Sequence, residues 1–276
     1  MMEFFRDIVA YDFMVNALVA CLLSGVTCGI VGSYIVARRM VFLCGGITHA
    51  SFGGLGIALY AGINPLVGAL SFASLSSLGI EFASRSGRMR EDSAVGIIWS
   101  VGMAVGALFM SLRPGYASDL TSYLFGNILL ISSSDIMWLG ILTLLLVVGS
   151  MLWLRPIMYM TFDEAYARSQ GIPTKLVSYI MAVVVAVTIV LSIKVMGIIL
   201  LLSLVTIPTV IASTFQKSYG RITLIAVAVA TFANIAGFML SYRYDLMTGV
   251  CIIFILVALL VVAKLLTILR YSRLNR

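Results

Sequence analysis

Residues 174–215 read TKLVSYIMAVVVAVTIVLSIKVMGIILLLSLVTIPTVIASTF, and this stretch decides what kind of fold the chain can form. It is almost entirely apolar, and its only charged residues are Lys175 at its start and Lys194 near its middle. Because the hydrocarbon core of a bilayer requires roughly 20 apolar residues per helix, the stretch has the length of two successive transmembrane helices. We expect these helices at 174–193 and 195–215.

The same pattern extends along the whole chain. Of its 276 residues, 62% are hydrophobic and 11% are charged, whereas soluble domains carry about 25% charged residues. We therefore predict a single, all-α, polytopic membrane domain (1–276) with about nine transmembrane helices, eight being the alternative count. The expected helices are 12–37, 41–62, 64–84, 92–112, 135–154, 174–193, 195–215, 221–242 and 247–268.

The positions of the basic residues predict the orientation. The net charge of +7 does not by itself indicate nucleic acid, because basic residues beside apolar spans are selected by membrane insertion. With nine helices and the N-terminus outside, 14 Lys and Arg fall inside and 4 outside, which accounts for all 18. One helix more or fewer would destroy this asymmetry. The positive-inside rule thus places the N-terminus outside and the C-terminus inside.

Several local features add detail to this predicted arrangement of helices. The segment 120–132 is apolar but too short to cross, so we expect an external or re-entrant half-helix there. Pro208 should kink its helix, which could line a pathway or merely shape packing. Residues 1–7 lack the basic region of a signal peptide, so we expect the first helix to be retained. Small residues in 41–62 favour close helix packing, namely Gly45, Gly46, Gly53, Gly54 and Gly56.

The loop 155–173 carries its own helix signals. Thr161 and Glu164 have the spacing of a capping box, Gly171 stands where a left-handed C-terminal residue would, and Pro173 follows. A helix of about nine residues is marginal alone in water. It must therefore pack on the protein itself or in a partner's groove. We predict an aromatic face and a charged face, made of Phe162, Ala165, Tyr166 and Ser169, and of Asp163, Glu164 and Arg168, respectively.

On these residues alone, an ordinary connecting helix remains the competing interpretation. However, residues 162–172, FDEAYARSQGI, resemble the D-E-x-x-A-R-x-x-G coupling segment of the permease subunits of zinc, manganese and iron ABC transporters of bacteria. Other stretches resemble the same family in order along the chain: MVFLCGGITHAS (40–51), EDSAVGI (91–97), YLFGNIL (123–129), and KVMGIIL with the later Ile207-Pro208.

The resemblance implies a homodimer in the bacterial cytoplasmic membrane, two cytoplasmic ATPase subunits, and an extracytoplasmic binding protein that delivers zinc, manganese or iron for import. This chain has no GxxxxGK[ST] motif, so ATP would bind the partner, and we expect neither enzymatic activity nor a resident cofactor here. Gly197 and Pro208 would shape the pathway. The residues implied in ATPase coupling are Phe162, Asp163, Glu164, Tyr166, Arg168 and Gly171.

His49 is the only histidine and is expected at mid-membrane depth, where an ionisable group is a candidate functional residue. Imidazole suits zinc, manganese or iron, although the ring could instead bond a nearby carbonyl or Thr48. The chain departs from the family at Gly45, where an aspartate usually stands. Cys44 does not replace that aspartate, since it points about 140° away from His49 on a helix. The resulting weak site would still suit a permease, which must release its cargo.

The acidic residues have simpler explanations. Glu81 and Arg85 have the spacing of an i, i+4 ion pair. Asp119, Asp135 and Asp245 are expected on the outer side, where they are either solvated or meet a cation or binding protein.

Three alternatives compete with this interpretation. A permease for metal chelates shares the coupling logic, and the missing aspartate leaves it open. A secondary transporter would need a carboxylate near the bilayer centre, which we do not find. A membrane enzyme would need an HExxH motif or paired mid-membrane aspartates, and the sequence shows neither.

Overall fold

The computed structural model describes residues 11–87, 89–112 and 131–274. Within them, nine helices are long and apolar enough to cross a membrane, which confirms the predicted all-α, polytopic fold. These are α2 (Asp12–Ala37), α3 (Val41–Ala61), α4 (Pro65–Arg85), α5 (Glu91–Ser111), α7 (Ser133–Phe162), α9 (Thr174–Met196), α10 (Ile198–Phe215), α11 (Tyr219–Tyr244) and α12 (Thr248–Leu274). The short helix α8 (Glu164–Ser169) links α7 to α9.

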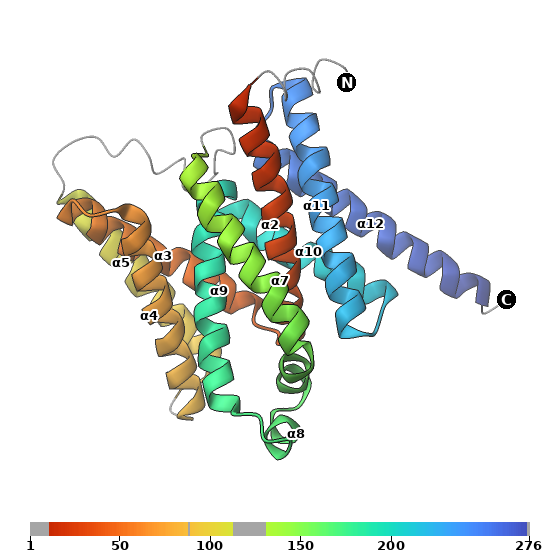
Figure 1. Cartoon of the computed structure of the whole chain (residues 1–276), viewed down its shortest axis with the longest axis horizontal. Coiled ribbons are helices and arrows are strands. Elements are labelled where there is room, and N and C mark those ends of the chain that lie inside the picture. The colour runs from red at the N-terminus through yellow and green to blue at the C-terminus, as the bar shows by residue number, and fades with distance from the viewer. Residues whose placement is uncertain (1–10, 88, 113–130, 275–276) are drawn as a thin grey trace.

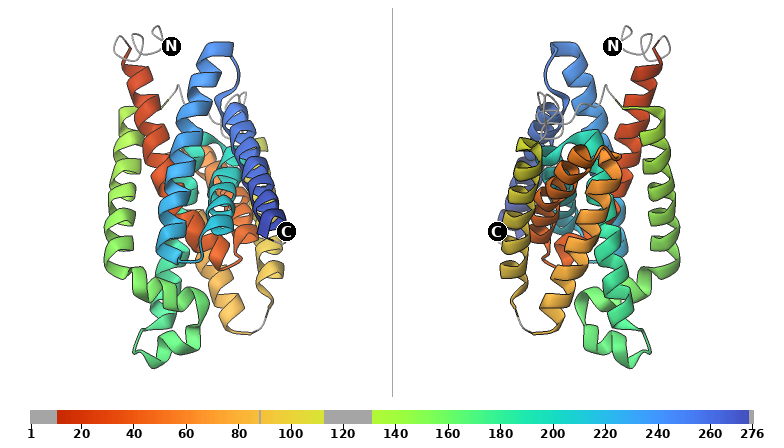
Figure 2. Two further views of the ribbon diagram at one scale, coloured as in Figure 1. Left: turned by 90° about the vertical axis from the view of Figure 1, so that its right-hand side faces the viewer. Right: turned by 90° about the vertical axis from the view of Figure 1, so that its left-hand side faces the viewer.

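The helices form one bundle in which the long helices that follow one another along the chain run in alternating directions (Figure 1). α3, α4 and α5 lie on one side, α11 and α12 on the other, and α2, α7, α9 and α10 between them. α2 packs against α7, α10 and α11, whereas α3 packs against α4, α5 and α9. α8 lies at the end opposite the start of α2 in all three views (Figures 1 and 2).

Glycines allow the helices α3 and α5 to approach each other closely. A Cβ atom added at Gly53 would lie 2.8 Å from the carbonyl oxygen of Gly102, and one at Gly56 would lie 2.6 Å from that of Gly106. Such distances leave no room for a side chain, so the two backbones touch directly. The packing role expected for these glycines is therefore confirmed, although Gly45 is different, as described below.

The boundary of α7 differs from the prediction. The helix expected at 135–154 continues to Phe162, with one interruption at Trp153, whose φ of −115° and ψ of 17° are not helical. Pro156 is tolerated because it lies in the first turn after this break, where its missing N–H has no intrahelical partner to lose. The predicted half-helix 120–132 lies mainly outside the described residues, and Ser132 caps the start of α7.

Gly197 separates α9 from α10, close to the break expected at Lys194. Its φ of 78° and ψ of 167° form a backbone conformation that is essentially restricted to glycine. α10 then continues through Pro208, which is buried. Because proline has no N–H, the carbonyl of Leu204 lacks its usual helical donor at this point.

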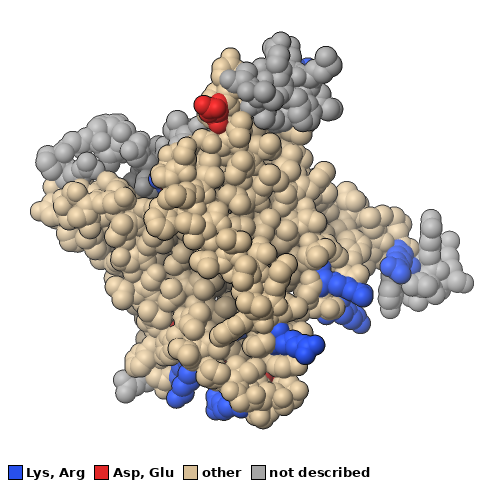
Figure 3. Space-filling model, viewed as in Figure 1, with Lys and Arg blue, Asp and Glu red and all other residues tan. Residues whose placement is uncertain are grey.

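Basic side chains gather at the end of the bundle that carries α8 (Figure 3). This distribution follows from the alternating helix directions, since α2, α4, α7 and α10 all end on that side of the bundle, and α12 runs in the same direction as they do (Figure 1). The described basic residues assigned to this end are Arg38, Arg39, Arg85, Arg90, Arg155, Arg168, Lys175, Lys217, Arg221, Lys264 and Arg270.

Candidate functional site

The start of α8 is capped by Asp163 rather than by the predicted box of Thr161 and Glu164. Asp163 has an extended backbone, and its Oδ1 accepts a hydrogen bond of 2.9 Å from the backbone N–H of Tyr166. Thr161 belongs to the last turn of α7, where its hydroxyl donates to the carbonyl of Ile157 at 2.6 Å. The predicted capping box was wrong because α7 extends further than expected, so that Thr161 belongs to α7 and its hydroxyl bonds within that helix.

The end of α8 agrees with the prediction. Gly171 adopts a φ of 77°, in the left-handed region. Its N–H donates to the carbonyl of Arg168 at 3.1 Å, and the N–H of Ile172 donates to that of Ala167 at 3.2 Å. These two bonds are the Schellman motif, which satisfies the last carbonyl groups of a helix.

α8 packs on the protein through Ala167 rather than through the predicted aromatic face. Ala167 is fully buried and lies in a small apolar cluster with Met160 and Val177. By contrast, the side chains of Phe162 and Tyr166 are 66% and 45% exposed. The protein's own surface therefore covers the alanine, and the two aromatic rings at this polar end remain available to a partner.

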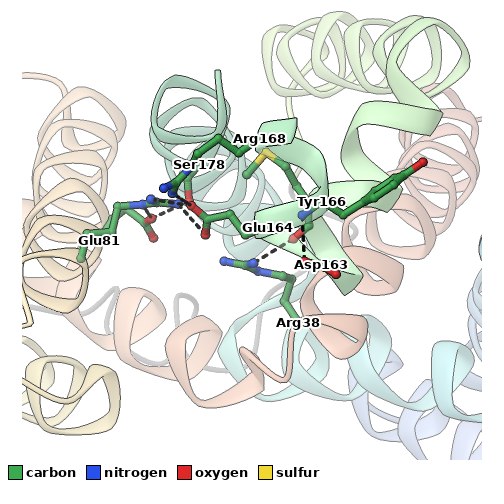
Figure 4. Close-up of polar contacts among 9 residues, drawn as sticks. Arg38, Glu81, Asp163, Glu164, Tyr166, Arg168 and Ser178 are labelled. Carbon is green, nitrogen blue, oxygen red and sulfur yellow. Dashed lines mark hydrogen bonds and ion pairs between the residues drawn. The ribbon is translucent and has the colours of Figure 1, made fainter. Parts of the chain in front are cut away.

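Glu164, Arg85 and Glu81 form a continuous chain of charges, and Figure 4 labels its two carboxylates, Glu81 and Glu164. Arg85 donates from its two terminal nitrogens to the two carboxylate oxygens of Glu164, at 3.0 and 3.2 Å. Its Nε donates to Glu81 at 2.5 Å, which confirms the predicted i, i+4 pair. We call Glu81, Arg85, Glu164, Arg168 and Ser178 the Arg85 network.

The outer members of the network differ in burial. Ser178 of α9 donates to Glu81 at 2.5 Å and is buried, so the network joins α4, α8 and α9. Arg168 donates to Glu164 at 3.3 Å, but its side chain is 67% exposed. The bidentate contact between Arg85 and Glu164 fixes both distance and orientation, which a single contact does not. α8 is thereby held rigidly to the end of α4.

The charge of Glu164 is favoured in the folded protein. Burial raises the pKa of this carboxyl, but the hydrogen bonds and positive charge of Arg85 outweigh that effect, and Thr174 and Arg168 add to them. The pKa of Glu164 therefore lies below the ordinary glutamate value. Glu164 remains ionised, and paired with Arg85, throughout the physiological pH range.

A second arginine holds the other side of the same turn. Arg38, which follows α2, donates from Nη1 to the carbonyl of Met160 at 3.1 Å (Figure 4). This carbonyl belongs to the last turn of α7, where helix carbonyls lack intrahelical donors and carry partial negative charge. Arg38 and Arg85 thus attach the 155–173 loop to α2 and to α4, on both sides of Asp163.

His49 lies in α3 and is half-buried. Its ring stacks on the indole of Trp99 from α5, with centroids 4.3 Å apart and planes inclined by 9°. Thr48 donates to the carbonyl of Cys44 at 2.7 Å. Among the described residues, no three His, Cys, Asp or Glu side chains come together as a metal-binding group.

The space around Gly45 explains what the missing aspartate would have met. A Cβ atom added there would lie 3.7 Å from Cζ3 of Trp99 and 3.9 Å from Cδ2 of Leu202, which are ordinary contact distances. Position 45 is therefore open to a side chain, unlike Gly53 and Gly56. Positions 45 and 49 both border Trp99, so the two share one side of α3.

At the opposite end of the bundle, Asp135 has a structural partner. Lys194 donates to its Oδ1 at 2.5 Å, and Asp135 also completes a capping box with Ser132 at the start of α7. Asp245 ends α11 in the left-handed region, with a φ of 52°. Both acids thus have local roles, and Asp119 lies outside the described residues.

Comparison with known proteins places these features in a family. The model of the ABC 3 transport family matches residues 10–267. The chain belongs to the ABC 3 transport family. A probable metal transport system membrane protein of Thermotoga maritima is 35% identical over 254 residues, covering 92% of this chain and 90% of the relative. The manganese transport system membrane protein MntC of Halalkalibacterium halodurans is 29% identical, covering 91% and 86%.

A solved structure shares the fold of this ABC 3 transporter chain. PsaBC from Streptococcus pneumoniae, in complex with Fab, matches with a TM-score of 0.84 and 22% identity. The match covers 95% of this chain and 94% of that one. The protein is thus a multi-pass membrane permease of the metal-transporting ABC type.

Proposed function

We propose that this chain is the membrane-spanning subunit of an ATP-driven importer of zinc, manganese or iron. In this proposal an extracytoplasmic binding protein delivers the metal, two copies of the chain form the pathway, and separate cytoplasmic subunits hydrolyse ATP. Family membership and the names of the relatives support metal transport. The chain itself carries no ATP-binding motif.

The observation that carries the proposal is the attachment of α8. A helix that transmits movement from an ATPase must expose a surface to that partner and be held firmly by the membrane helices. α8 meets both requirements, because Phe162 and Tyr166 are exposed while the contact between Arg85 and Glu164 is bidentate. We propose that each ATPase docks on one α8 and moves α4 through Arg85.

The remaining coupling residues have defined places in this arrangement. Asp163 and Gly171 set the two ends of α8, and Arg168 adds an exposed charge beside Glu164. Since basic residues gather at this end, the positive-inside rule supports a cytoplasmic α8, with the N-terminus outside and the C-terminus inside a bacterial cytoplasmic membrane.

For the metal, we propose a transient contact with His49 beside Trp99. The half-buried imidazole can offer one nitrogen ligand, and in a dimer whose two copies face each other there, the second His49 would offer another. Such a site binds a dication loosely, as a conducting pathway requires. Gly197 and Pro208 would shape the pathway on α9 and α10, where the backbone departs from a continuous helix or lacks a donor.

The test is metal uptake into proteoliposomes that contain this chain with the ATPase and binding protein encoded beside it. We expect zinc, manganese or iron to accumulate only with ATP. Glu164→Arg should abolish uptake, because it places two like charges together at Arg85, while ATP hydrolysis continues without transport. Uptake that persists without ATP would contradict the proposal.

A chelate permease is the second candidate, and Gly45 favours it. Without a carboxylate at position 45, the chain presents one imidazole rather than two ligands on that side of α3. The same proteoliposomes distinguish the candidates when supplied with a free metal ion or with its siderophore complex. Uptake of the complex alone would replace the metal-ion proposal.

A further inference from the structure

A large cavity lies between α7 and the rest of the bundle, in the half that carries α8. Its volume is about 300 Å³, and its lining comes from α2, α7, α9 and α11. Most lining side chains are apolar, and the lining includes Val31, Tyr34, Leu145, Gly149, Ile180 and Tyr219. This volume reaches the range of small-molecule sites.

The break in α7 and its small residues account for the cavity. Trp153 interrupts the helix beside the cavity, and Gly149 presents no side chain to it. A Cβ atom added at Gly149 would meet nothing within 4 Å. Figure 2 shows α7 along the outer edge of the bundle in both views, so the cavity lies beneath a peripheral helix.

The cavity is open to the bilayer. The lining residues Leu145 and Leu152 are 65% and 72% exposed, and Ile180 is also exposed. An apolar cavity at this depth offers water few hydrogen-bond partners, so it does not favour water. The occupant available from the surrounding bilayer is therefore the hydrocarbon chain of a lipid.

Charge identifies the rest of the occupant. Arg155 and Arg221 are exposed, and each lies on a helical turn that also lines the cavity: Arg155 between Leu154 and Ile157, Arg221 between Tyr219 and Thr223. Basic residues between membrane helices bind anionic lipid headgroups. We propose that the cavity binds one acyl chain of an anionic phospholipid, whose headgroup is held by Arg155 and Arg221.

The site also touches the α8 attachment. The ring of Tyr219 lines the cavity and meets the ring of Phe162 edge-on, with centroids 6.3 Å apart. The part of α7 between Trp153 and Phe162 leads directly into α8. The bound lipid would therefore lie next to the segment on which the proposed ATPase docks, with Tyr219 between the cavity and Phe162. The lipid site does not depend on that proposal, because binding can be measured on this chain alone.

The experiment is native mass spectrometry of the full chain, extracted in mild detergent, with phosphatidylglycerol and phosphatidylcholine of matched chain length. We expect about one phosphatidylglycerol retained per chain. Gly149→Phe should reduce its retention about tenfold by filling the cavity. Gly79→Phe is the matched control, because Gly79 is exposed on α4 and also meets nothing within 4 Å; retention there should not change.

Further variants separate the two parts of the site. Arg155→Gln with Arg221→Gln should remove the preference for phosphatidylglycerol while leaving phosphatidylcholine binding intact. Ser150→Leu provides a second cavity-filling variant if Gly149→Phe does not fold. Three results would each overturn the proposal. Phosphatidylglycerol retention could fall equally in the Gly79→Phe control, or the wild-type chain could retain no lipid. Gly149→Phe could also change the oligomeric state, which would show that a second chain occupies the cavity.

Discussion

The α8 end of the protein and the surroundings of His49 are built from opposite kinds of side chain. At α8, two carboxylates share Arg85, and α2, α4 and α9 all contribute hydrogen bonds. Around His49, the described contacts are with Trp99, and position 45 carries no carboxylate although a Cβ atom would fit there. The comparison suggests that rigidity is concentrated where force would be transmitted, and that ligands are few where cargo would pass.

Removing Arg85 should loosen the attachment of α8 to α4, and it has the largest expected effect. Arg85→Met leaves Glu81 and Glu164 without their shared partner, and the side chains of Arg85 and Glu81 are only 19% and 11% exposed. Leaving buried charges unpaired costs about 2–3 kcal/mol or more. We expect a lower melting temperature in detergent and ATP hydrolysis without metal uptake.

The matched control for Arg85→Met is Arg168→Gln, which removes the exposed arm of the same network. An exposed pair contributes about 0–1 kcal/mol, so stability and uptake should be nearly unchanged. If both variants behave alike, the bidentate contact is not what holds α8.

Adding a second ligand beside His49 should make the metal bind more tightly. Gly45→Asp places a carboxylate four residues before His49, at a position where a Cβ atom makes only ordinary contacts. We expect zinc or manganese to bind at least about tenfold more tightly, since each 1.4 kcal/mol of added interaction is a factor of ten. Calorimetric titration of the purified chain measures this change.

Gly45→Asn is the neutral control, because it has nearly the same shape without the charge. His49→Ala in the Gly45→Asp background should return affinity to the starting value. Tight binding that survives this second substitution would place the metal elsewhere.

A substitution at Gly171, which follows α8, should show how much this glycine stabilises the end of the helix. Gly171→Ala forces a Cβ into a φ of 77°, which should destabilise the end of α8 by about 1 kcal/mol. Hydrogen exchange should show faster opening of residues 164–172. Gly62→Ala, at a φ of 70° at the far end of α3, should cost a similar amount without changing exchange in α8.

The smallest expected effect is on pH dependence. Because the pKa of Glu164 is lowered in the folded protein, this carboxyl stabilises the fold above the ordinary glutamate pKa, and the contribution is lost as pH falls through the folded value. Melting temperatures measured from pH 7 down to about 3 should fall less in Glu164→Gln than in the wild type. The corresponding difference in the free energy of unfolding should be below about 1 kcal/mol, because the pair of Glu164 and Arg85 is partly solvated.

Local features of the fold could be predicted because they depend on short stretches of chain. Hydropathy located the helices, since each span must satisfy its own backbone hydrogen bonds in the bilayer. The pair of Glu81 with Arg85 and the left-handed Gly171 also followed from spacing within one or two turns. The error at Thr161 arose at a boundary, where the choice of cap depends on how far the preceding helix continues.

The sequence by itself determined that the chain crosses the membrane many times, that basic residues gather on one side, and that the 155–173 loop contains a short helix. These properties arise from composition and from neighbours along the chain. Only the tertiary structure decided that Arg85 binds Glu164, that Trp99 covers His49, and that a cavity lies beneath α7. Such contacts join residues far apart in sequence, and helix packing alone sets which of their faces meet.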